Sequence, residues 1–205
     1  MINSPVVFIV DDDRAVRDSL KWLVESHGRN VQAYASAKEF VEQYCPDMPG
    51  CLLLDVRMPE MNGLDLQKEL HNREIDIPII FISAHGTVPT AVRALKLGAV
   101  DFVMKPFNNV ALLDKIEHAL EIDKHQREAQ KRKSSIAERV ASLTPREQEV
   151  MRLIVAGCPP KKIAAELGIS NKTVDVHRSH IMEKLAIKSV AELVKMVLSL
   201  EGQYH

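Results

Sequence analysis

The sequence predicts an α/β domain with a doubly wound, five-stranded parallel sheet, followed by a long linker helix and an all-α domain of four helices. Three observations lead to this prediction. Short apolar runs alternate with amphipathic stretches over residues 1–120, as in repeated βαβ units. A charged stretch without Gly or Pro follows. The remaining residues show helical patterns with clear start and stop signals.

Five apolar runs in the first part are the predicted strands. Short, almost wholly apolar runs separated by helical patterns are typical of buried parallel strands. The second run is the weakest of the five. The runs span residues 6–10, 31–34, 51–54, 78–82 and 102–104.

The stretches between these runs carry apolar residues at helical spacing, which predicts helices packed on the sheet in a three-layer sandwich. Each set of apolar residues lies on one side of its helix. The clearest sets are Val16, Leu20, Leu23 and Val24 and, in a later helix, Ala91, Ala94, Leu95 and Gly98.

Residues 121–138 are rich in charge and in strong helix formers, so we expect a solvated helical linker. A flexible charged tether is the alternative, because the Ser134-Ser135 pair can break a helix. The predicted domains are therefore residues 1–120, the linker 121–138 and residues 139–205.

The last part of the chain has the start and stop signals of short helices. Thr144 with Glu147 forms a capping box, and Pro145 suits the first helical position. Gly157 ends that helix, and Ser170 is the expected cap of the third. The four helices are expected over residues 145–156, 160–166, 171–185 and 189–200.

Charge is spread unevenly along the chain. Residues 1–120 hold 12 basic and 17 acidic residues, a net of −5, whereas residues 139–205 hold 10 and 7, a net of +3. These two parts are therefore expected to have different partners. The three cysteines lack metal-ligand spacing, and neither a basic leader nor an apolar run of membrane-spanning length is present. We therefore expect a cytoplasmic protein without a membrane segment.

Polar residues directly follow four of the five apolar runs. Asp11 and Asp12 follow the first run, Asp55 the third, Ser83 the fourth and Lys105 the fifth. Parallel sheets assemble ligand sites at the carboxyl ends of their strands, so these side chains should converge. Neighbouring carboxylates repel unless a cation lies among them, and Mg²⁺ is the cation expected here.

These groups predict phosphoryl transfer to a carboxylate. Asp55 is the expected nucleophile, and the product is an aspartyl phosphate. Lys105 and Ser83 are expected to stabilise charge on the phosphoryl oxygens. A single Asp after a strand is usually a turn or cap residue. We therefore interpret Asp13 as a helix start and His85 as a solvent-facing loop residue.

Four short motifs in this part carry a family resemblance. They are Asp11-Asp12, Asp55-Val56-Arg57-Met58-Pro59, Ser83-Ala84-His85-Gly86 and Lys105-Pro106-Phe107. Through them, residues 5–120 resemble the receiver domain of two-component response regulators, which has a flavodoxin-like fold. The resemblance implies that Asp55 accepts a phosphoryl group from a sensor histidine kinase. It implies that Asp12 binds Mg²⁺ directly, Asp11 largely through water and Arg57 through its carbonyl, with Asp55 completing the set, and that the peptide bond before Pro106 is cis.

Phe102 lies where the receiver family places its aromatic switch, although Tyr is commonest there. Phosphorylation is expected to draw Ser83 toward the phosphoryl group and to open space for the Phe102 ring, which alters the face made by residues 88–104. The candidates for dimerisation on that face are Val88, Val92 and Leu95. The alternative is that these apolar residues belong to the core.

A turn at Gly168 followed by a helix with one apolar and one polar face satisfies the requirements of a helix-turn-helix reader of DNA. Val174, Ile181 and Leu185 are expected to hold this helix on the core. The alternatives are a helical interaction domain that binds no nucleic acid and a metal site at His177 and His180. The candidate DNA-binding residues are Lys162, Asn171, Lys172, Thr173, Asp175, His177 and Arg178.

This second part also carries family motifs, which are Leu143-Thr144-Pro145-Arg146-Glu147, Leu167-Gly168-Ile169-Ser170, Thr173-Val174 and Ile181-Met182-Glu183-Lys184-Leu185. Through them, residues 143–198 resemble the LuxR-type domain of FixJ and NarL regulators. Two departures concern DNA contact. Pro160 removes an amide that might meet a phosphate, and Asp175 repels the DNA backbone unless it reads a cytosine amine.

The last predicted helix is expected to pair two copies of the chain on DNA, with core packing as the alternative for the same side chains. The residues concerned are Leu193, Met196, Val197 and Leu200.

The order of these parts resembles a FixJ-class response regulator, so we interpret the chain as a phosphorylation-controlled transcription factor rather than an enzyme. The resemblance implies a histidine kinase, double-stranded promoter DNA, RNA polymerase and a homodimer formed on phosphorylation as partners, and it favours activation. An aspartate-nucleophile phosphohydrolase is one alternative, but residues 1–120 leave no room for a cap domain. A second alternative is a phosphorylation-independent DNA-binding protein that uses its receiver only for dimerisation.

Overall fold

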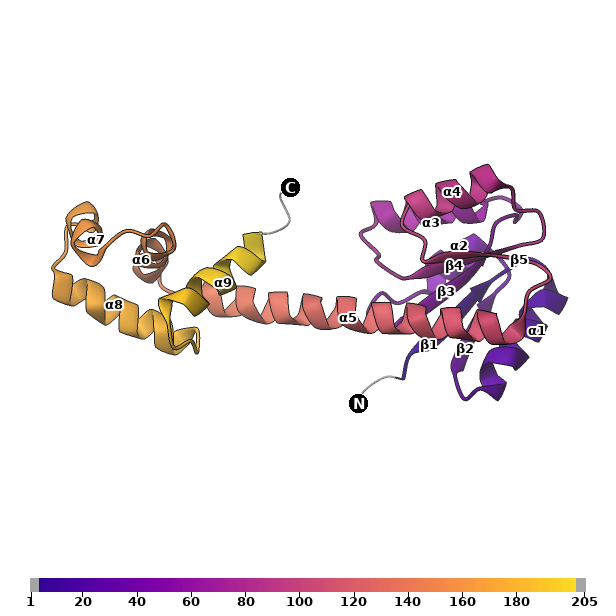
Figure 1. The fold of residues 1–205 in the computed structure, drawn as a ribbon, viewed down its shortest axis with the longest axis horizontal. Helices are drawn as coiled ribbons and strands as arrows, with labels where there is room; N and C mark the ends of the chain where they lie inside the picture. The colour runs from indigo at the N-terminus through magenta and orange to yellow at the C-terminus, as the bar shows by residue number, and fades with distance from the viewer. Residues whose placement is uncertain (1–3, 202–205) are drawn as a thin grey trace. The chain divides into compact units, whose positions relative to one another are not determined.

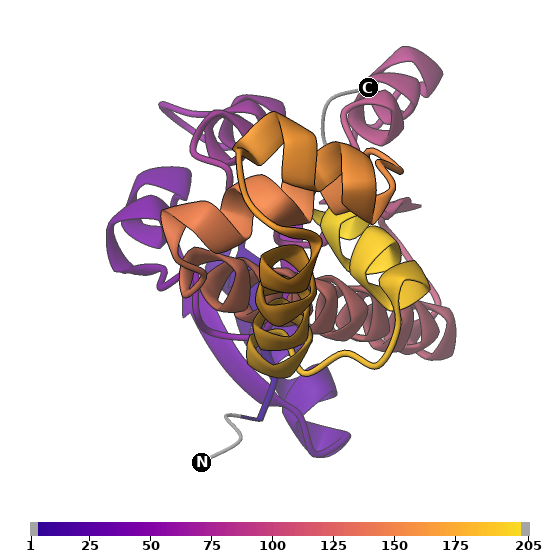
Figure 2. The ribbon, with the colours of Figure 1, turned by 90° about the vertical axis from the view of Figure 1, so that its left-hand side faces the viewer.

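The computed structural model describes residues 4–201, which form two compact units. Residues up to Arg127 belong to the first unit and residues from Glu128 belong to the second. Each unit has hydrophobic core residues of its own. Figures 1 and 2 show the ribbon of the chain. The boundaries predicted at residues 120 and 138 stay predictions.

The first unit contains the predicted parallel sheet of five strands. The strand order is β2-β1-β3-β4-β5, and every neighbouring pair is parallel (Figure 1). Each apolar run predicted its strand to within one residue at either end. The strands are β1 (Val6–Val10), β2 (Asn30–Tyr34), β3 (Gly50–Asp55), β4 (Ile79–Ser83) and β5 (Asp101–Met104).

Both faces of the sheet are covered by helices, namely α1 (Arg14–Ser26), α2 (Ala37–Gln43), α3 (Gly63–Asn72), α4 (Val88–Lys96) and the first part of α5 (Asn109–Ala141). Successive side chains of a strand point to opposite faces of the sheet. Phe8 therefore joins the core with α2, α3 and α4, whereas Val7 and Ile9 join the core with α1 and α5. The predicted three-layer sandwich is confirmed.

Helix α1 packs on the sheet through the predicted face, since Leu20, Leu23 and Val24 are buried. Its opposite side carries Trp22, the one tryptophan of the chain, whose exposed fraction is 71%.

Helix α4 packs on the sheet through fewer side chains than predicted. Ala94 is fully buried, but Leu95, predicted on the same face, is 46% exposed. Gly98 lies beyond the helix and is also exposed. The predicted common face is therefore wrong. Val88 and Val92 are exposed as well, so the apolar side chains of α4 proposed for dimerisation are not core residues.

Helix α5 is continuous through the predicted linker, so the flexible-tether alternative is wrong. The expected solvation is found only in part. Asp123 is 2% exposed, and its Oδ2 accepts a hydrogen bond from Gly50 N at 3.0 Å. Arg127 pairs with Asp123 and donates through Nη2 to the carbonyls of Pro46 at 2.9 Å and Met48 at 2.8 Å. The first turns of the predicted linker are therefore anchored on the first unit.

The second unit consists of the last turns of α5 and the four predicted helices, α6 (Pro145–Val155), α7 (Pro160–Leu167), α8 (Asn171–Lys184) and α9 (Val190–Glu201). Thr144 and Glu147 form the predicted capping box. Helix α7 ends at Gly168, whose φ of 65° lies in the left-handed region that glycine adopts without strain. Ser170 caps α8 as predicted. Over residues 4–201, none of the helices is both long and apolar enough to cross a membrane.

Candidate functional site

The polar residues predicted to converge do meet at the carboxyl end of the sheet. Asp55 and Ser83 are the last residues of β3 and β4, and Asp11 and Lys105 directly follow β1 and β5. The strands are paired in register, since Asp55 lies opposite Ile82 on the neighbouring strand. Four separate strands therefore contribute to one site.

Lys105 joins the two buried carboxylates of this site. Its Nζ donates to Asp11 Oδ2 at 2.7 Å and to Asp55 Oδ1 at 2.9 Å. The other carboxylate oxygens accept backbone hydrogen bonds, Asp11 Oδ1 from Asp13 N at 2.9 Å and Asp55 Oδ2 from Arg57 N at 2.6 Å. Each of the four oxygens thus keeps a lone pair for a further ligand.

The electrostatics of the site favour an additional cation. Burial raises the pKa of Asp11, and the Asp55 charge adds to this, although hydrogen bonds from Lys105 and Asp13 oppose it. Burial by itself lowers the pKa of Lys105, but the hydrogen bonds to both carboxylates outweigh it and the net pKa is raised. One ammonium therefore faces two carboxylates, and one negative charge stays unbalanced.

The other two predicted metal ligands are the Asp12 carboxylate and the Arg57 carbonyl. Asp12 is exposed, and the backbone N–H of the exposed Arg57 contacts Asp55. Among residues 4–201, no three His, Cys, Asp or Glu side chains lie close enough together to hold a metal ion. The oxygen donors of Asp11 and Asp55, with the Asp12 carboxylate next in sequence, nevertheless suit a hard cation such as Mg²⁺. The donor chemistry fits the expected ion, and the ligand set stays a prediction.

A close approach of α3 helps to hold the end of β3. Gly63 N donates to the carbonyl of Val56 at 3.0 Å, and a Cβ built on Gly63 would lie 2.3 Å from the carbonyl oxygen of Asp55. Only glycine allows this contact. Sequence reasoning missed Gly63, although Asn62, which caps α3, marks the turn in which it lies.

Of the predicted switch residues, Ser83 ends β4, the strand next to β3, and Phe102 lies on β5 opposite Phe81. Ser83 is 1% exposed, and its Oγ accepts a hydrogen bond from His85 N at 3.2 Å. The half-buried ring of Phe102 stacks on Phe81 with the ring centroids 6.1 Å apart. A Cβ on Gly86 would lie 2.5 Å from the Phe102 ring, so a glycine in the loop after β4 makes room for that ring. Sequence reasoning did not assign Gly86 this part.

Three smaller predictions about this loop region are confirmed. Asp13 caps α1, since its side chain accepts a hydrogen bond from Ala15 N at 2.8 Å. The Lys105-Pro106 peptide bond is cis. His85 is an exposed loop residue.

Helix α8 has the apolar face predicted for a recognition helix, because Val174, Ile181 and Leu185 are buried. The opposite face carries exposed residues at helical spacing. These residues are Lys172, Val176 and Ser179, and Val176 is 46% exposed. Sequence reasoning missed the last two, although the spacing from Lys172 would have found them.

The other candidate DNA-binding residues differ in exposure. His177 and Arg178 are half-buried because they lie nearer the core side of α8, and Thr173 is half-buried in the first turn. The exposed candidates are Lys162 on α7 and Asn171, Lys172 and Asp175 on α8.

A buried carboxylate connects α6 to α8. Glu147 is 3% exposed, accepts hydrogen bonds from Lys184 Nζ at 2.7 Å and Thr144 N at 2.8 Å, and lies 3.9 Å from His180 Nδ1. The Lys184 ammonium and the Thr144 N–H lower the pKa of Glu147 to about 2. Among residues 4–201, no group of three potential ligand side chains is close enough to hold a metal ion, so the alternative of a metal site at His177 and His180 gains no support.

The prediction that the apolar side chains of α9 pair two copies of the chain is wrong for Leu193, and it stays a prediction for Met196, Val197 and Leu200, which are half-buried. Leu193 is fully buried, and Met196 and Val197 pack against the same core. Leu200 is half-buried, and Leu198 is the large apolar side chain of α9 that is most exposed, at 54%.

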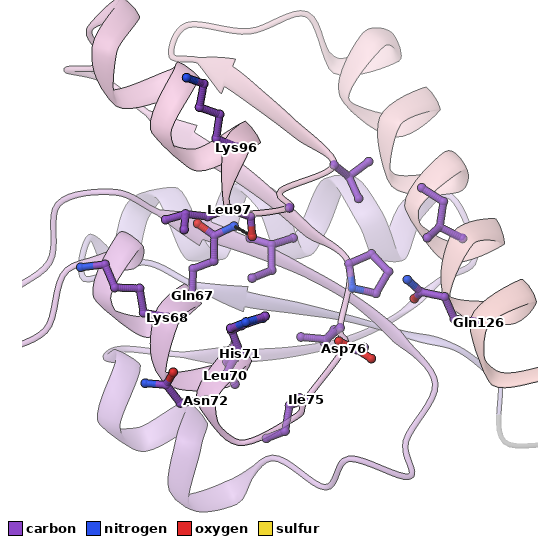
Figure 3. A pocket seen from close by; sticks show the side chains of 16 residues that line it. Gln67, Lys68, Leu70, His71, Asn72, Ile75, Asp76, Lys96, Leu97 and Gln126 are labelled. Atoms are coloured by element: carbon purple, nitrogen blue, oxygen red, sulfur yellow. Dashed lines mark hydrogen bonds between the residues drawn. The ribbon is translucent and has the colours of Figure 1, made fainter. Parts of the chain in front are cut away.

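A pocket of about 780 Å³ lies at the opposite end of the sheet, where β4 begins (Figure 3). Gln67 in its wall is 4% exposed and donates through Nε2 to the carbonyls of Ala94 at 3.2 Å and Leu97 at 3.1 Å. This side chain therefore ties α3 to the end of α4. Because Ile79 lines the pocket and Ser83 ends the same strand, the pocket is separate from the acidic pair.

Two family profiles match the chain in succession. The response regulator receiver domain matches residues 7–117, and the luxR family of bacterial regulatory proteins matches residues 141–197.

Known proteins match both parts together. Nodulation protein W of Bradyrhizobium diazoefficiens is 46% identical over 191 residues, which cover 93% of this chain and 84% of that protein. The transcriptional regulatory protein FixJ of Azorhizobium caulinodans is 41% identical over 198 residues, which cover 97% and 94%. Among solved structures, the response regulator StyR superposes with a TM-score of 0.85 at 46% identity and covers 95% of this chain and 98% of its own.

Proposed function

Because this chain belongs to the response regulators that combine a receiver domain with a LuxR-family regulatory domain, we propose that phosphorylation of Asp55 controls its binding to promoter DNA. One observation carries the proposal. The Lys105 ammonium is hydrogen-bonded to Asp11 and Asp55 at the end of the sheet where Ser83 is buried. These contacts supply a nucleophile, a cation and a hydroxyl for phosphoryl transfer.

In the proposed reaction, an oxygen of the Asp55 carboxylate attacks the phosphorus of a phosphohistidine on a sensor histidine kinase. An O–P bond forms while the P–N bond to the kinase breaks, and the leaving imidazole keeps the electron pair of that bond and takes up a proton. The product is an acyl phosphate on Asp55. Mg²⁺ held by Asp11, Asp12, Asp55 and the Arg57 carbonyl would offset the negative charge of the phosphoryl group.

Lys105 and Ser83 then act on the phosphoryl oxygens. The Lys105 ammonium pairs with one oxygen, and the Ser83 hydroxyl, which accepts from His85 N in the unmodified chain, donates to another. Movement of Ser83 frees space for the Phe102 ring. The exposed apolar face of α4 then pairs two phosphorylated copies.

Helix α8 is proposed to enter the major groove with the face opposite Val174 and Ile181 toward the DNA. On that face Lys172 suits a phosphate oxygen and Val176 suits a thymine methyl group. Two copies would present two such helices to a promoter and favour activation through RNA polymerase. The further contacts proposed are Lys162, Asn171, Thr173, Asp175, His177 and Arg178.

The test compares Asp55→Asn with the wild type after incubation with acetyl phosphate and Mg²⁺. Asp47→Asn is the control, because Asp47 is an exposed carboxylate in the loop before β3 and the charge change is the same. Incorporated phosphate is measured by mass spectrometry and oligomeric state by sedimentation. DNA affinity is measured by fluorescence anisotropy on a duplex selected by the wild type from a random library.

We expect the wild type and Asp47→Asn to gain one phosphoryl group, to dimerise and to bind the duplex more tightly. Asp55→Asn should gain none of these. Equal DNA affinity of all three proteins with and without acetyl phosphate would instead support a DNA-binding protein that is independent of phosphorylation.

A further inference from the structure

Arg17, on the first turns of α1, reaches back to the acidic turn that follows β1. Its Nη1 donates to the backbone carbonyl oxygens of Asp11 at 2.7 Å and Asp12 at 2.9 Å. Its own backbone N–H donates to the carbonyl of Asp13 at 3.0 Å, the first helical hydrogen bond of α1. One half-buried guanidinium therefore contacts two successive peptide units.

These two carbonyls lie where regular backbone pairing is interrupted. The paired residues of β1 end at Val10, and the helical hydrogen bonds of α1 begin at its N-cap, Asp13. The turn between them would otherwise depend on water to satisfy its carbonyls. Hydrogen bonds from a charged donor are shorter and stronger than neutral ones, so Arg17 fixes the planes of both peptide units.

The orientation of these peptide units matters most for Asp12. The Asp11 carboxylate is held separately by Asp13 N and Lys105. The Asp12 side chain is exposed, so the direction in which it points depends mainly on the conformation of its backbone. A change in that backbone would turn Asp12 away from the buried pair of carboxylates.

We infer that Arg17 is a positioning residue for the cation site. By binding the carbonyls of Asp11 and Asp12, it holds the acidic turn in the conformation from which both carboxylates reach one Mg²⁺. This inference rests on the function proposed above. The charge of Arg17 alone would repel a cation and weaken its binding. The inferred effect of Arg17 on Mg²⁺ affinity is therefore opposite to the effect of its charge. Removal of the charge and loss of the positioning therefore change Mg²⁺ affinity in opposite directions.

The test is a calorimetric titration of the unphosphorylated full chain with MgCl₂, for the wild type, Arg17→Gln and Arg17→Lys. Arg14→Gln is the matched control, because Arg14 lies on the same helix, is 86% exposed at its side chain and pairs only at 3.5 Å with Asp18. Circular dichroism without Mg²⁺ gives the thermal stability of each variant. The titrations are made at a temperature at which all the variants are folded.

We expect the Mg²⁺ dissociation constant of Arg17→Gln to rise about tenfold, the size of effect usual for residues that orient metal ligands. Arg17→Lys, which keeps the charge but not the planar donor group, should also bind more weakly. Arg14→Gln should stay within about twofold of the wild type. If Arg17→Gln does not fold, Arg17→Lys alone decides the question.

An unchanged or lower dissociation constant in the Arg17 variants would overturn the inference and leave the proposed function intact. A purely structural role would lower the thermal stability without Mg²⁺ and leave the dissociation constant of the folded variants unchanged, which likewise overturns it. If the wild type itself neither binds Mg²⁺ nor accepts phosphate from acetyl phosphate, the proposed function fails together with the inference.

Discussion

Among the residues that the structure describes, each buried charged side chain has more than one polar partner. Asp11 and Asp55 both accept a hydrogen bond from the Lys105 ammonium, and each also accepts one from a backbone N–H. Glu147 likewise accepts hydrogen bonds from the Lys184 ammonium and the Thr144 N–H. An isolated buried charge would cost several kcal/mol. Replacement of one member of such a group should therefore have a larger effect than replacement of an exposed charge nearby.

Glu147→Gln should destabilise the second unit by about 1–3 kcal/mol, because Lys184 loses its charged partner and the cap of α6 is weakened. Denaturant unfolding of the full chain, followed by circular dichroism, measures this change. Glu149→Gln is the control, since Glu149 is an exposed neighbour on the same helix that pairs with Arg146. A loss of equal size in the two variants would contradict the prediction.

The lowered pKa of Glu147 also predicts how stability depends on pH. The folded state has a pKa of about 2 for this group against an ordinary value of 4.5. The stabilisation is therefore fully present above pH 4.5 and is lost as the pH falls toward 2. We expect the unfolding temperature of the second unit to fall more steeply over this range in the wild type than in Glu147→Gln. Calorimetry at a series of pH values measures the difference, and identical slopes would refute it.

Lys172 and Val176 lie on the same outer face of α8 but should affect DNA binding in different ways. Lys172→Ala should weaken binding to all sequences and reduce the slope of log affinity against log salt by about 1, because a phosphate contact is lost. Val176→Ala should leave that slope unchanged and reduce the preference for thymine at one position. Anisotropy titrations over a range of salt concentrations and duplexes separate the two effects. A salt slope altered by Val176→Ala would exclude the proposed role.

Among the secondary structure elements, those with a regular pattern of apolar residues were predicted best from the sequence. Most strand residues are apolar, with β2, which contains Asn30 and Gln32, as the weakest case, so the positions of the strands could be predicted almost to the residue. Helix α4 could not, because it packs mainly through Ala94 and exposes Leu95. The anchoring of α5 was not predictable either, since Asp123 is a charged residue in a charged stretch and its partner, Gly50 N, is distant in sequence.

The same distinction applies to the candidate site. Asp11, Asp55, Ser83 and Lys105 could be predicted to meet because each lies at the end of a strand. The contact of Gly63 depends on how closely two pieces of backbone approach, and that of Arg17 on how far its side chain reaches back to a turn, and periodicity encodes neither.

The contact between α3 and the end of β3 gives a prediction about this site. Gly63→Ala should destabilise the first unit by about 1–3 kcal/mol, because the new methyl group overlaps the carbonyl oxygen of Asp55. It should also slow the phosphorylation of Asp55 by acetyl phosphate, which mass spectrometry follows in time. Asn72→Ala is the control, as Asn72 is exposed at the end of the same helix. If Gly63→Ala had the stability and the phosphorylation rate of the wild type, β3 would have shifted without loss of free energy, and the prediction would be wrong.

At the scale of the whole molecule, the chain divides into two units whose charge and cores differ. The first has its apolar side chains on the two faces of a sheet, and the second has them between helices. The acidic first part carries the proposed phosphorylation site, and the basic last part carries the proposed DNA-binding helix. In the proposed function, the phosphoryl group and the DNA therefore bind to separate parts of the chain.

Separate cores predict two transitions in calorimetric unfolding of the full chain. Arg127→Gln should lower only the transition of the first unit, because Arg127 contacts Asp123, Pro46 and Met48 within it. Lys124→Gln is the control, because Lys124 is an exposed residue in the same turns of α5 and pairs only with Glu121 of that helix. Glu147→Gln should lower only the other transition. One joint transition that moves with either change would show that the two units unfold together.

Trp22 has a practical consequence for optical experiments on this protein. Its indole is already hydrated in the folded chain, so loss of the fold should hardly change its fluorescence. A protein or membrane surface that covers α1 would instead transfer the indole to a drier environment and shift the emission to shorter wavelength. The native fluorophore is therefore a poor reporter of unfolding and a direct reporter of docking at that helix.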